Sequence, residues 1–223
     1  MNVYAKGRRR HSMKLVVTEI FYSLQGEGPF IGSPSVFIRL GGCIDPICPW
    51  CDTEYAWHEF SEMGSDEIIA QINRYDCRNV VITGGEPFLQ WETGLKDLHC
   101  ELVGSGYHIF YETSGKVDLP GLVDATIVMS PKYIEGQWHL PLGNIGNADY
   151  FKFVAADAAA LDEIDRFVKD HAISKDRVFI MPEGKTRAEQ FKRMETVFSF
   201  CRDNGYIMSP RLHVLIFDNK RGV

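Results

Sequence analysis

The stretch GGCIDPICPWCDTEYAW, residues 41–57, carries the strongest signal in this chain. It holds three of the six cysteines, at Cys43, Cys48 and Cys51. A disulfide joins two thiols, and a closed zinc or iron–sulfur site usually has four protein ligands. Three cysteines in one short loop therefore indicate either a site with one open ligand position or a fourth ligand from elsewhere in the chain.

The spacing C-x4-C-x2-C alone leaves three interpretations. The first is a zinc site completed by a fourth ligand such as His58 or Cys77. The second is a set of structural cysteines that bind no metal. The third is a [4Fe–4S] cluster held by three thiolates, with one iron open to an exogenous ligand. The remaining cysteines, Cys77, Cys100 and Cys201, are dispersed, which is typical of thiols that pack as small hydrophobic residues.

The composition is that of an ordinary globular protein. The chain has 223 residues, 45% hydrophobic and 24% charged, which is enough for a substantial core. A net charge of −6 argues against nonspecific binding to nucleic acid or to an anionic membrane. No apolar run approaches the roughly 18 residues of a membrane span. We therefore expect neither a nucleic-acid partner nor a membrane location.

The N-terminal segment MNVYAKGRRRHSMKL is basic and lacks the apolar segment of a secretory signal. We expect residues 1–12 to form a disordered extension and residues 13–223 to form a single domain. A cytoplasmic location is the corresponding expectation. Thiols stay reduced there, so clustered cysteines indicate metal binding or catalysis rather than a disulfide framework.

Apolar runs of strand length alternate with helix-like stretches along the chain. The predicted strands are residues 35–40, 79–83, 108–113, 126–130, 150–155, 177–181 and 212–217. The predicted helices are residues 66–74, 92–105, 158–171 and 187–203, with Asp157 as the N-cap of the third and Gly205 just beyond the last. Residues 116–125 and 131–149 are expected to be irregular.

This order predicts an α/β fold with parallel strands and a site at their carboxyl ends. Four helices for seven strands are too few for an eightfold barrel, which favours a partial, open (β/α) barrel with fewer helices than strands. Polar or glycine-rich segments follow most strands, among them GGC, GGEP, SGK, SPK and PEG. We expect these segments and the cysteine loop to meet on one face.

The surroundings of the cysteines narrow the choice. Trp50 lies between the last two cysteines, Thr53 follows them by two residues, and the next strand ends in TGGEP, residues 83–87. Together with the cysteine loop, these features resemble the radical S-adenosylmethionine (SAM) enzymes. The resemblance implies a [4Fe–4S] cluster on the three cysteines, with SAM on the open iron. The commonest spacing in those enzymes is C-x3-C-x2-C, so this chain has one extra loop residue.

The glycines of TGGEP suit an approach of backbone to a ligand where a Cβ would clash. We expect Glu86 in this motif to accept a hydrogen bond from the amino group of SAM. The SAM contacts that the resemblance implies are Trp50, Asp52, Gly84, Gly85, Glu86, Ser130, Pro131, Lys132, Met181, Pro182, Glu183 and Gly184.

A second, closer resemblance extends over most of the chain. The segment EIFYSLQGEGPFIGSPSVFIRLGGC, residues 19–43, is similar to the 7-carboxy-7-deazaguanine synthases (QueE). Further matches are CDTEYAW (51–57), VVITGGEP (80–87), YETSG (111–115), SPK (130–132) and the terminal NKRGV (219–223).

This resemblance implies a reaction on 6-carboxy-5,6,7,8-tetrahydropterin. A 5′-deoxyadenosyl radical from SAM removes hydrogen from C6, the ring contracts, ammonia leaves, and 7-carboxy-7-deazaguanine forms. Mg²⁺ held by Thr53 beside the substrate carboxylate is also implied, as is a fork from Arg39 for a carboxylate or ring oxygen. The substrate contacts implied are Leu24, Gln25, Gly26, Glu27, Arg39, Thr83, Glu112 and Val223.

The resemblance also implies a homodimer and a flavodoxin- or ferredoxin-type reductant. Two other functions remain open at this stage. A glycyl-radical activating enzyme would share the cysteines, SAM and the barrel but would act on a protein. A structural or electron-carrying module would use zinc or an iron–sulfur centre without SAM.

Overall fold

Nine strands form one sheet in the computed structural model, which describes residues 14–223. In order across the sheet they are β11 (Ile207–Met208), β10 (Val178–Pro182), β9 (Tyr150–Ala155), β6 (Ala125–Met129), β5 (His108–Thr113), β4 (Asn79–Gly84), β2 (Pro34–Leu40), β1 (Lys14–Leu24) and β3 (Ser61–Gly64). Strands β2 to β11 are parallel, whereas β1 pairs antiparallel with both β2 and β3. The predicted disordered extension at residues 1–12 lies outside the described residues.

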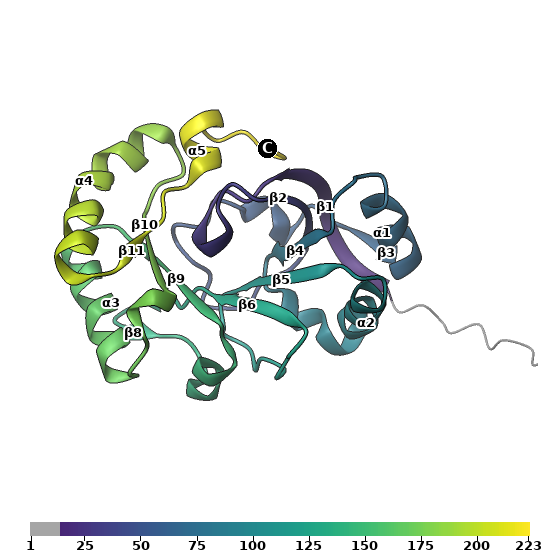
Figure 1. Ribbon diagram of the computed structural model, residues 1–223, viewed down its shortest axis with the longest axis horizontal. Helices are drawn as coiled ribbons and strands as arrows, with labels where there is room; N and C mark the ends of the chain where they lie inside the picture. Colours follow the sequence, from purple (N-terminus) through teal and green to yellow (C-terminus); the bar gives the residue numbers. More distant parts are fainter. Residues whose placement is uncertain (1–13) are drawn as a thin grey trace, which may run out of the picture.

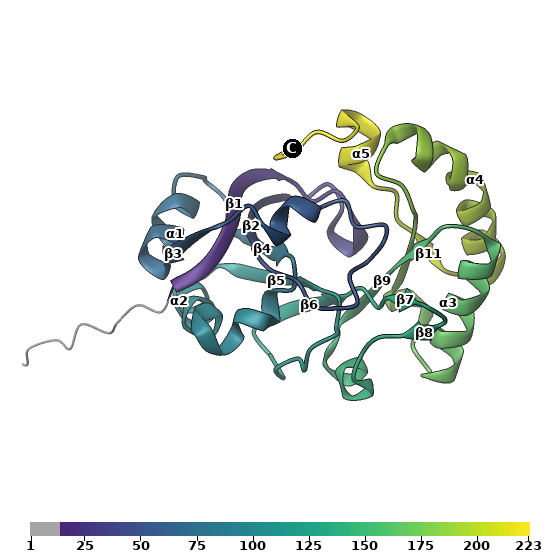
Figure 2. The ribbon, with the colours of Figure 1, turned by 180° about the vertical axis from the view of Figure 1, so that it is seen from behind.

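Five α-helices accompany the sheet in the described part of the chain. They are α1 (Ser65–Ile72), α2 (Lys96–Gly104), α3 (Ala158–Asp170), α4 (Arg187–Asn204) and α5 (Leu212–Phe217). Figure 1 shows a curved sheet with α1 to α4 around its outside and α5 near the C-terminus, and Figure 2 shows this arrangement from behind. Because β11 and β3 form two separate edges, the fold is the predicted open, partial barrel with fewer helices than strands.

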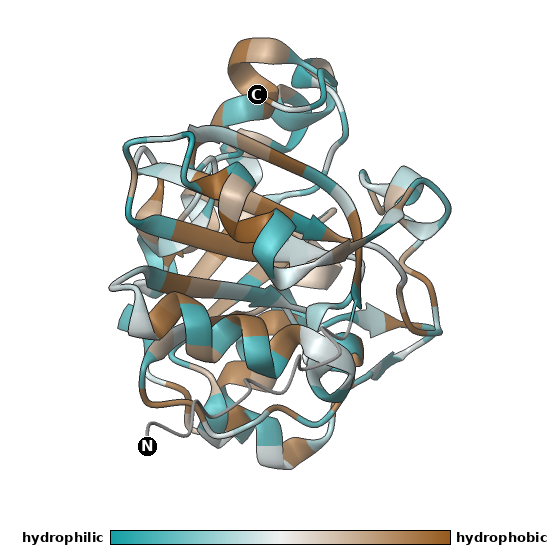
Figure 3. Ribbon diagram, turned by 90° about the vertical axis from the view of Figure 1, so that its right-hand side faces the viewer, coloured by the Kyte–Doolittle hydropathy of each residue, from teal (hydrophilic) through white to brown (hydrophobic). Residues whose placement is uncertain are grey.

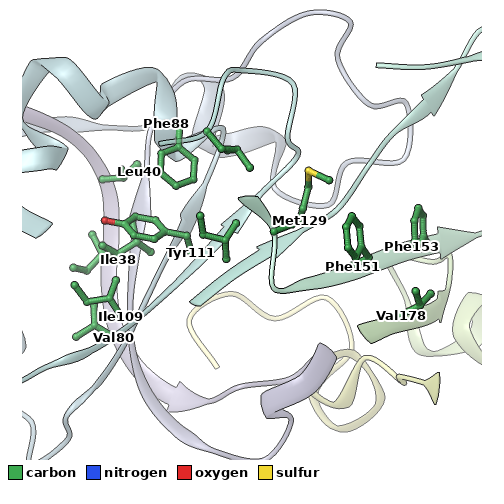
Figure 4. Packing of buried hydrophobic residues seen from close by; sticks show 14 of the residues in the cluster. Ile38, Leu40, Val80, Phe88, Ile109, Tyr111, Met129, Phe151, Phe153 and Val178 are labelled. Carbon is green, nitrogen blue, oxygen red and sulfur yellow. The ribbon is translucent and has the colours of Figure 1, made fainter. Parts of the chain in front are cut away.

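Alternate residues of each strand point to opposite sides of the sheet. Those facing the helices are apolar and buried, and Ile38, Val80, Ile109 and Tyr111 from three neighbouring strands pack together (Figure 4). In Figure 3 the strands carry mainly apolar residues, while helices carry both apolar and polar ones. Burial of this apolar face stabilises the sheet by roughly 25 cal/mol for each Å² removed from water.

The other side of the sheet is different in character. Arg39, Thr83, Glu112 and Lys152 occupy the intervening positions of β2, β4, β5 and β9, and they line a cavity on the concave side. The alternation along each strand therefore places its apolar residues in the core and its polar residues in the cavity.

The predicted strand at residues 212–217 is wrong, since these residues form α5. The amide of Leu215 donates to the carbonyl of Arg211 at 3.0 Å, and that of Asp218 donates to the carbonyl of Val214 at 2.9 Å. A short apolar run lacks the period that would separate a strand from a helical turn. The last strand is instead β11, which the sequence prediction omits.

The prediction also omits β1, an edge-proximal strand with a period of two. Leu15 and Val17 of β1 are buried, while Val16 between them is partly exposed. The antiparallel register pairs Leu24 with Pro34, the first residue of β2, so the loop after β1 begins at the amino end of β2. The excursion predicted at residues 131–149 contains a two-stranded hairpin, β7 (Tyr133–Ile134) with β8 (Gln137–Trp138), and a short 3₁₀ helix over Leu142–Asn147.

The helix boundaries follow from local signals. The predicted N-cap Asp157 accepts a hydrogen bond from the amide of Ala160 at 2.9 Å. Gly205 ends α4 in the left-handed conformation, with φ 74°. Helix α2 begins later than predicted, because residues Trp91–Leu95 form a wide turn in which Gly94 has φ 147°. Only glycine adopts that angle without strain.

We expect alanine substitutions at two phenylalanines, one buried and one exposed, to change the stability of the protein by different amounts. Phe153 is 1% exposed and packs on Trp138 and Phe167, with ring centroids 5.7 Å apart in both pairs. Phe153→Ala should lower the free energy of unfolding by about 3–5 kcal/mol through lost burial and a cavity. Phe198→Ala is the control, because Phe198 is 55% exposed. Urea unfolding would measure both, and similar losses would contradict this account of the core.

Candidate active site

A cavity of about 250 Å³ lies on the concave side of the sheet, at the carboxyl ends of the parallel strands. It is the place that the sequence predicts for the site. All but three of the predicted site residues line it. Those that do are Leu24, Gln25, Gly26, Glu27, Arg39, Cys43, Cys48, Trp50, Cys51, Asp52, Thr53, Thr83, Gly84, Gly85, Glu112, Ser130, Lys132, Met181, Glu183, Gly184 and Val223. The three that do not are Glu86, Pro131 and Pro182.

The three cysteines of the loop after β2 all face this cavity and are partly buried. Burial raises the pKa of Cys51 to about 11 and also raises the pKa of Cys43. Both thiols must therefore lose a proton when they bind iron. The side chain of Lys116 donates to the carbonyl of Pro46 at 2.5 Å and to the sulfur of Cys48 at 3.9 Å. A cation thus lies directly against the cysteine loop.

The candidate fourth ligands for zinc lie elsewhere. Neither His58 nor Cys77 lines the cavity, and the thiol of Cys77 donates to the carbonyl of Pro34 at 3.3 Å. Among residues 14–223, no three His, Cys, Asp or Glu side chains converge on a single ion position. The arrangement suits a cluster better than one ion, because each thiolate of a cluster binds a different iron.

The start of the cysteine loop is joined to the end of β4 by backbone contacts. The amide of Gly85 donates to the carbonyl of Leu40 at 3.0 Å, and that of Glu86 donates to the carbonyl of Gly42 at 2.9 Å. A Cβ at Gly85 would lie 1.4 Å from the Gly42 oxygen, and one at Gly84 would lie 2.2 Å from the Leu40 oxygen. The glycine pair is therefore required by loop-to-loop packing, whatever it contributes to a ligand.

Glu86 is fully buried below this contact. One carboxylate oxygen accepts from the hydroxyl of Thr113 at 2.7 Å and from the amide of Phe88 at 3.3 Å. The other accepts from the amide of Ser114 at 2.9 Å and from its hydroxyl at 2.5 Å. A carboxylate has about four acceptor positions, and here all four are used by the protein. This geometry favours a positioning role for Glu86 over direct contact with SAM.

The guanidinium of Arg39, predicted to bind a carboxylate or ring oxygen, lines the cavity and is anchored by Glu19. Its Nε donates to Glu19 at 2.7 Å, and the hydroxyl of Tyr55 donates to the same carboxylate oxygen at 2.9 Å. The two outer nitrogens of Arg39 have no hydrogen-bond partner within residues 14–223. They are thus free to bind a carboxylate or a ring oxygen.

Thr53 and Asp52 follow the last cysteine. The Thr53 hydroxyl donates to Asp52 at 2.7 Å and makes no capping bond to the 3₁₀ helix Glu54–Trp57 that it precedes. Thr53 therefore does not act as a turn cap, which is the ordinary structural role for a threonine here. Burial would raise the pKa of Asp52, but the guanidinium of Arg211 pairs with it and holds that pKa below its usual value.

The LQGEG loop after β1 packs against the C-terminal part of the chain. The amide of Gly28 donates to the hydroxyl of Ser209 at 2.7 Å, and the amide of Leu212 donates to the carbonyl of Gly26 at 2.8 Å. A Cβ at Gly26 would lie 2.1 Å from the ring of His213. Residues nearly the length of the chain apart therefore form one wall of the cavity.

Glu27 and Glu112 stand on this side of the cavity. Glu27 pairs with Lys152 at 2.8 Å and with Arg211 at 2.8 Å. Glu112 accepts from Lys152 at 3.2 Å and from the amide of Gln25 at 3.0 Å, and from the hydroxyl of Thr83 at 3.3 Å. Burial would raise the pKa of Glu27, but the charges of Lys152 and Arg211 hold it well below its usual value.

The opposite wall is formed by segments after β6 and β10. The side chain of Lys132 donates to the hydroxyl of Ser130 at 2.6 Å, and burial lowers the pKa of Lys132. The carbonyls of Pro182 and Gly184 both accept from the side chain of Gln190 at 2.9 Å. Gly184 has φ 151°, so its close packing on Glu189 of α4 needs glycine.

Several residues that line the cavity are missing from the sequence prediction. They are Phe21, Phe37, Trp57, Thr113, Ser114, Lys116, Lys152, Val154, Arg211 and His213. The signal for Lys152 was available, since a lysine in the apolar run YFKFVA occupies an inward position. For Arg211 and His213 there was no local signal, because the segment before α5 reaches the site only through the fold.

Comparison with known proteins agrees with this geometry. No protein-family model matches the chain. The 7-carboxy-7-deazaguanine synthase of Pyrobaculum aerophilum is 38% identical over 218 residues, covering 92% of this chain and 96% of that protein. The synthase of Halobacterium salinarum is 34% identical over 238 residues, covering 92% and 91%.

The chain belongs to the 7-carboxy-7-deazaguanine synthase family.

The crystal structure of QueE from Escherichia coli matches the fold with a TM-score of 0.77 and 25% sequence identity, over 90% of this chain and 95% of that one. Membership of this family implies a [4Fe–4S] cluster and SAM, and the three cysteines facing one cavity fit that pair. Within residues 14–223, none of the helices has both the length and the apolar character needed to span a membrane.

The contact between the glycine motif and the cysteine loop can be tested. Gly85→Ala should push the loop away from β4, because no rearrangement of a flexible side chain can relieve a clash with backbone. We expect most of the iron to be lost after anaerobic reconstitution. Gly121→Ala is the control, since a Cβ there meets nothing within 4 Å and its φ is ordinary. A Gly85→Ala protein with full iron content would contradict this assignment.

Proposed function

We propose that this protein converts 6-carboxy-5,6,7,8-tetrahydropterin to 7-carboxy-7-deazaguanine, with a [4Fe–4S] cluster and SAM. The observation that carries the proposal is the shared cavity. Three thiols of one loop and a set of pterin-compatible polar groups on the barrel strands face each other across it. Family membership supplies the reaction, and the cavity supplies a place where cofactor and substrate would meet.

The residues present fit the cluster and SAM. Cys43, Cys48 and Cys51 would hold three irons and leave the fourth open to SAM. Gly85 exposes backbone to the cavity without a side chain, which suits a close approach by the methionine part of SAM. When bound, this pair would supply a 5′-deoxyadenosyl radical that removes hydrogen from C6 of the pterin.

The protein would bind and orient the substrate through its inward-facing strand residues. The outer nitrogens of Arg39 present a fork suited to a carboxylate or ring oxygen. Glu112 lines the cavity, and its oxygen that accepts from Thr83 would also accept from N–H groups of the pterin ring. Gln25 contributes indirectly, because its amide already bonds to Glu112 and to the backbone of Glu27.

We also propose that Thr53 places Mg²⁺ beside the substrate carboxylate. Its oxygen lines the cavity, two residues after Cys51, and a sparse protein shell completed by substrate and water is usual for Mg²⁺. A homodimer, a flavodoxin- or ferredoxin-type reductant and a cytoplasmic location complete the proposal. The last two follow from a cluster that must be reduced and from thiols that must stay unoxidised.

The cysteine assignment predicts a sharp division among the six cysteines. Changing Cys43, Cys48 or Cys51 to Ala should abolish a stable cluster and all turnover, because each would hold one iron. Cys100→Ala should retain both, since Cys100 is exposed. Iron content and an anaerobic assay with the carboxytetrahydropterin, SAM, dithionite and Mg²⁺ would measure this. A wild-type protein that cleaves SAM but leaves the pterin unchanged would overturn the proposed reaction.

The magnesium assignment predicts a separate phenotype. Thr53→Val should keep the iron content and SAM binding but lower turnover about 10²-fold, because the reacting carbon loses its alignment. The response to added Mg²⁺ should disappear, whereas Thr53→Ser should retain much of both. A Val variant with full Mg²⁺-stimulated turnover would remove Thr53 from the site. Melting temperatures of both variants would separate this effect from loss of the Thr53–Asp52 bond.

A further inference from the structure

Lys152 is a buried cation in the middle of the barrel interior. It lies on β9 between Phe151 and Phe153, which face the core on the other side of the sheet. Its side chain is 7% exposed, and it lines the cavity. A lysine is almost never buried to this degree unless it is paired, so the position calls for an explanation.

The pairing of Lys152 is with two carboxylates on different elements. Its Nζ lies 2.8 Å from Glu27 and 3.2 Å from Glu112. Burial by itself would lower the pKa of Lys152, but the charges and hydrogen bonds of Glu112 and Glu27 more than offset this and raise it. Lys152 is therefore charged at neutral pH and links the loop after β1 to β5.

The two carboxylates depend on Lys152 to different degrees. Glu27 has a second cation, because its other oxygen pairs with Arg211 at 2.8 Å, with His213 at 3.8 Å beyond. Within the described residues, Lys152 is the only cation paired with Glu112. The remaining partners of Glu112 are the neutral side chains of Gln25 and Thr83. Loss of Lys152 would thus leave Glu112, and not Glu27, without a balancing charge.

The two carboxylate oxygens of Glu112 also have different hydrogen-bond partners. Oε1 accepts from Lys152 and from Gln25, at 3.2 and 3.0 Å. Oε2 meets only the hydroxyl of Thr83, at the long distance of 3.3 Å. Since Glu112 lines the cavity, Oε2 has acceptor capacity left for a ligand that donates N–H groups.

We propose that Lys152 is a positioning residue for the substrate, which orients Glu112 as the acceptor for N–H donors on the pyrimidine edge of the reduced pterin. The inference rests on the proposed function, because it assigns a substrate contact within it. Lys152 itself does not touch the reacting carbon. It acts through Glu112, and no step of the reaction transfers a proton to or from it.

Glu112 needs Lys152 because Glu112 and Glu27 are two carboxylates that lie close together in a buried site, where like charges are unfavourable. Without the cation between them, the two like charges would repel each other. Glu27 would stay paired with Arg211, whereas Glu112 would lose its one ion pair within the described residues. Glu112 would then no longer be held where its second oxygen can accept from N–H donors of the pterin. Lys132 also lines the cavity, but its side chain donates to Ser130.

The test compares Lys152→Met with wild type in the reconstituted protein. Lys152→Met keeps the side-chain length and removes the charge. We expect the KM for the carboxytetrahydropterin at pH 7 to rise about 10- to 100-fold, the cost of losing a hydrogen bond to a charged group. The iron content and the Kd for SAM should stay as in wild type, and kcat should change much less than KM. Glu112→Gln should raise KM in the same way, because both changes disturb the same acceptor.

Matched variants separate the alternatives. Lys152→Arg should restore a low KM, because it keeps the cation. Lys169→Met is the surface control, since the Lys169 side chain is 65% exposed on α3, and it should match wild type throughout. The double variant Lys152→Met with Glu112→Gln leaves the Glu27–Arg211 pair complete. Its KM should be no higher than that of Glu112→Gln alone, because Lys152 acts through Glu112.

The outcomes distinguish failure of the proposed reaction from failure of the role assigned to Lys152. If wild type does not consume the pterin, the proposed function fails. If wild type is active and Lys152→Met has an unchanged KM, the role of Lys152 is refuted. If Lys152→Met fails to fold, as its melting temperature would reveal, the double variant carries the test. A KM in the double variant well above that of Glu112→Gln alone would then overturn the inference.

Discussion

The close approach of Gly85 to the carbonyl of Gly42 is the contact on which the site depends. Two backbone hydrogen bonds join the end of β4 to the start of the cysteine loop, where a Cβ would lie 1.4 Å from an oxygen atom. The cysteines can face the cavity only because the backbone of the neighbouring strand supports their loop from beneath. Glu86 extends this support, since three hydrogen bonds from Thr113 and Ser114 tie the end of β5 to the same point. The glycine motif is thus structural first, and any contact with SAM is added to that role.

The two faces of the sheet differ in polarity. Residues facing the helices are apolar and supply the burial that stabilises the fold, as in the cluster around Tyr111 (Figure 4). Residues facing inward include Arg39, Glu112 and Lys152, whose charges would be costly in a dry interior. The cost is reduced by ion pairing, since Lys152 and Arg211 each lie between two carboxylates and Arg39 pairs with Glu19. Asp52, Arg211, Glu27, Lys152 and Glu112 form one continuous chain of ion pairs from the cysteine loop to β5.

Much of the site could be predicted from local sequence. The cysteines, the glycine pair and Thr53 lie close together in short motifs, and the combination of these motifs, rather than the cysteine spacing alone, indicates a cluster with SAM. A motif cannot show which oxygens of Glu86 the protein itself already uses. The prediction at residues 212–217 was wrong, since a six-residue apolar run satisfies both a strand and a helical turn. Arg211 and His213 could not be found locally, because their neighbours in space are Gly26 and Glu27, far away in the chain.

By itself, the sequence determined the class of fold and the identity of the metal-binding loop. Strand and helix periods act over a few residues, and three cysteines within one loop must lie near one another however the chain folds. The tertiary structure decided which charges meet. Whether Lys152 is a surface lysine or a buried link between Glu27 and Glu112 depends on β1, β5 and β9 coming together, and on curvature of the sheet that closes them around one cavity. Electrostatic interactions in a buried site depend on distance and solvent exclusion, and both are properties of the folded chain alone.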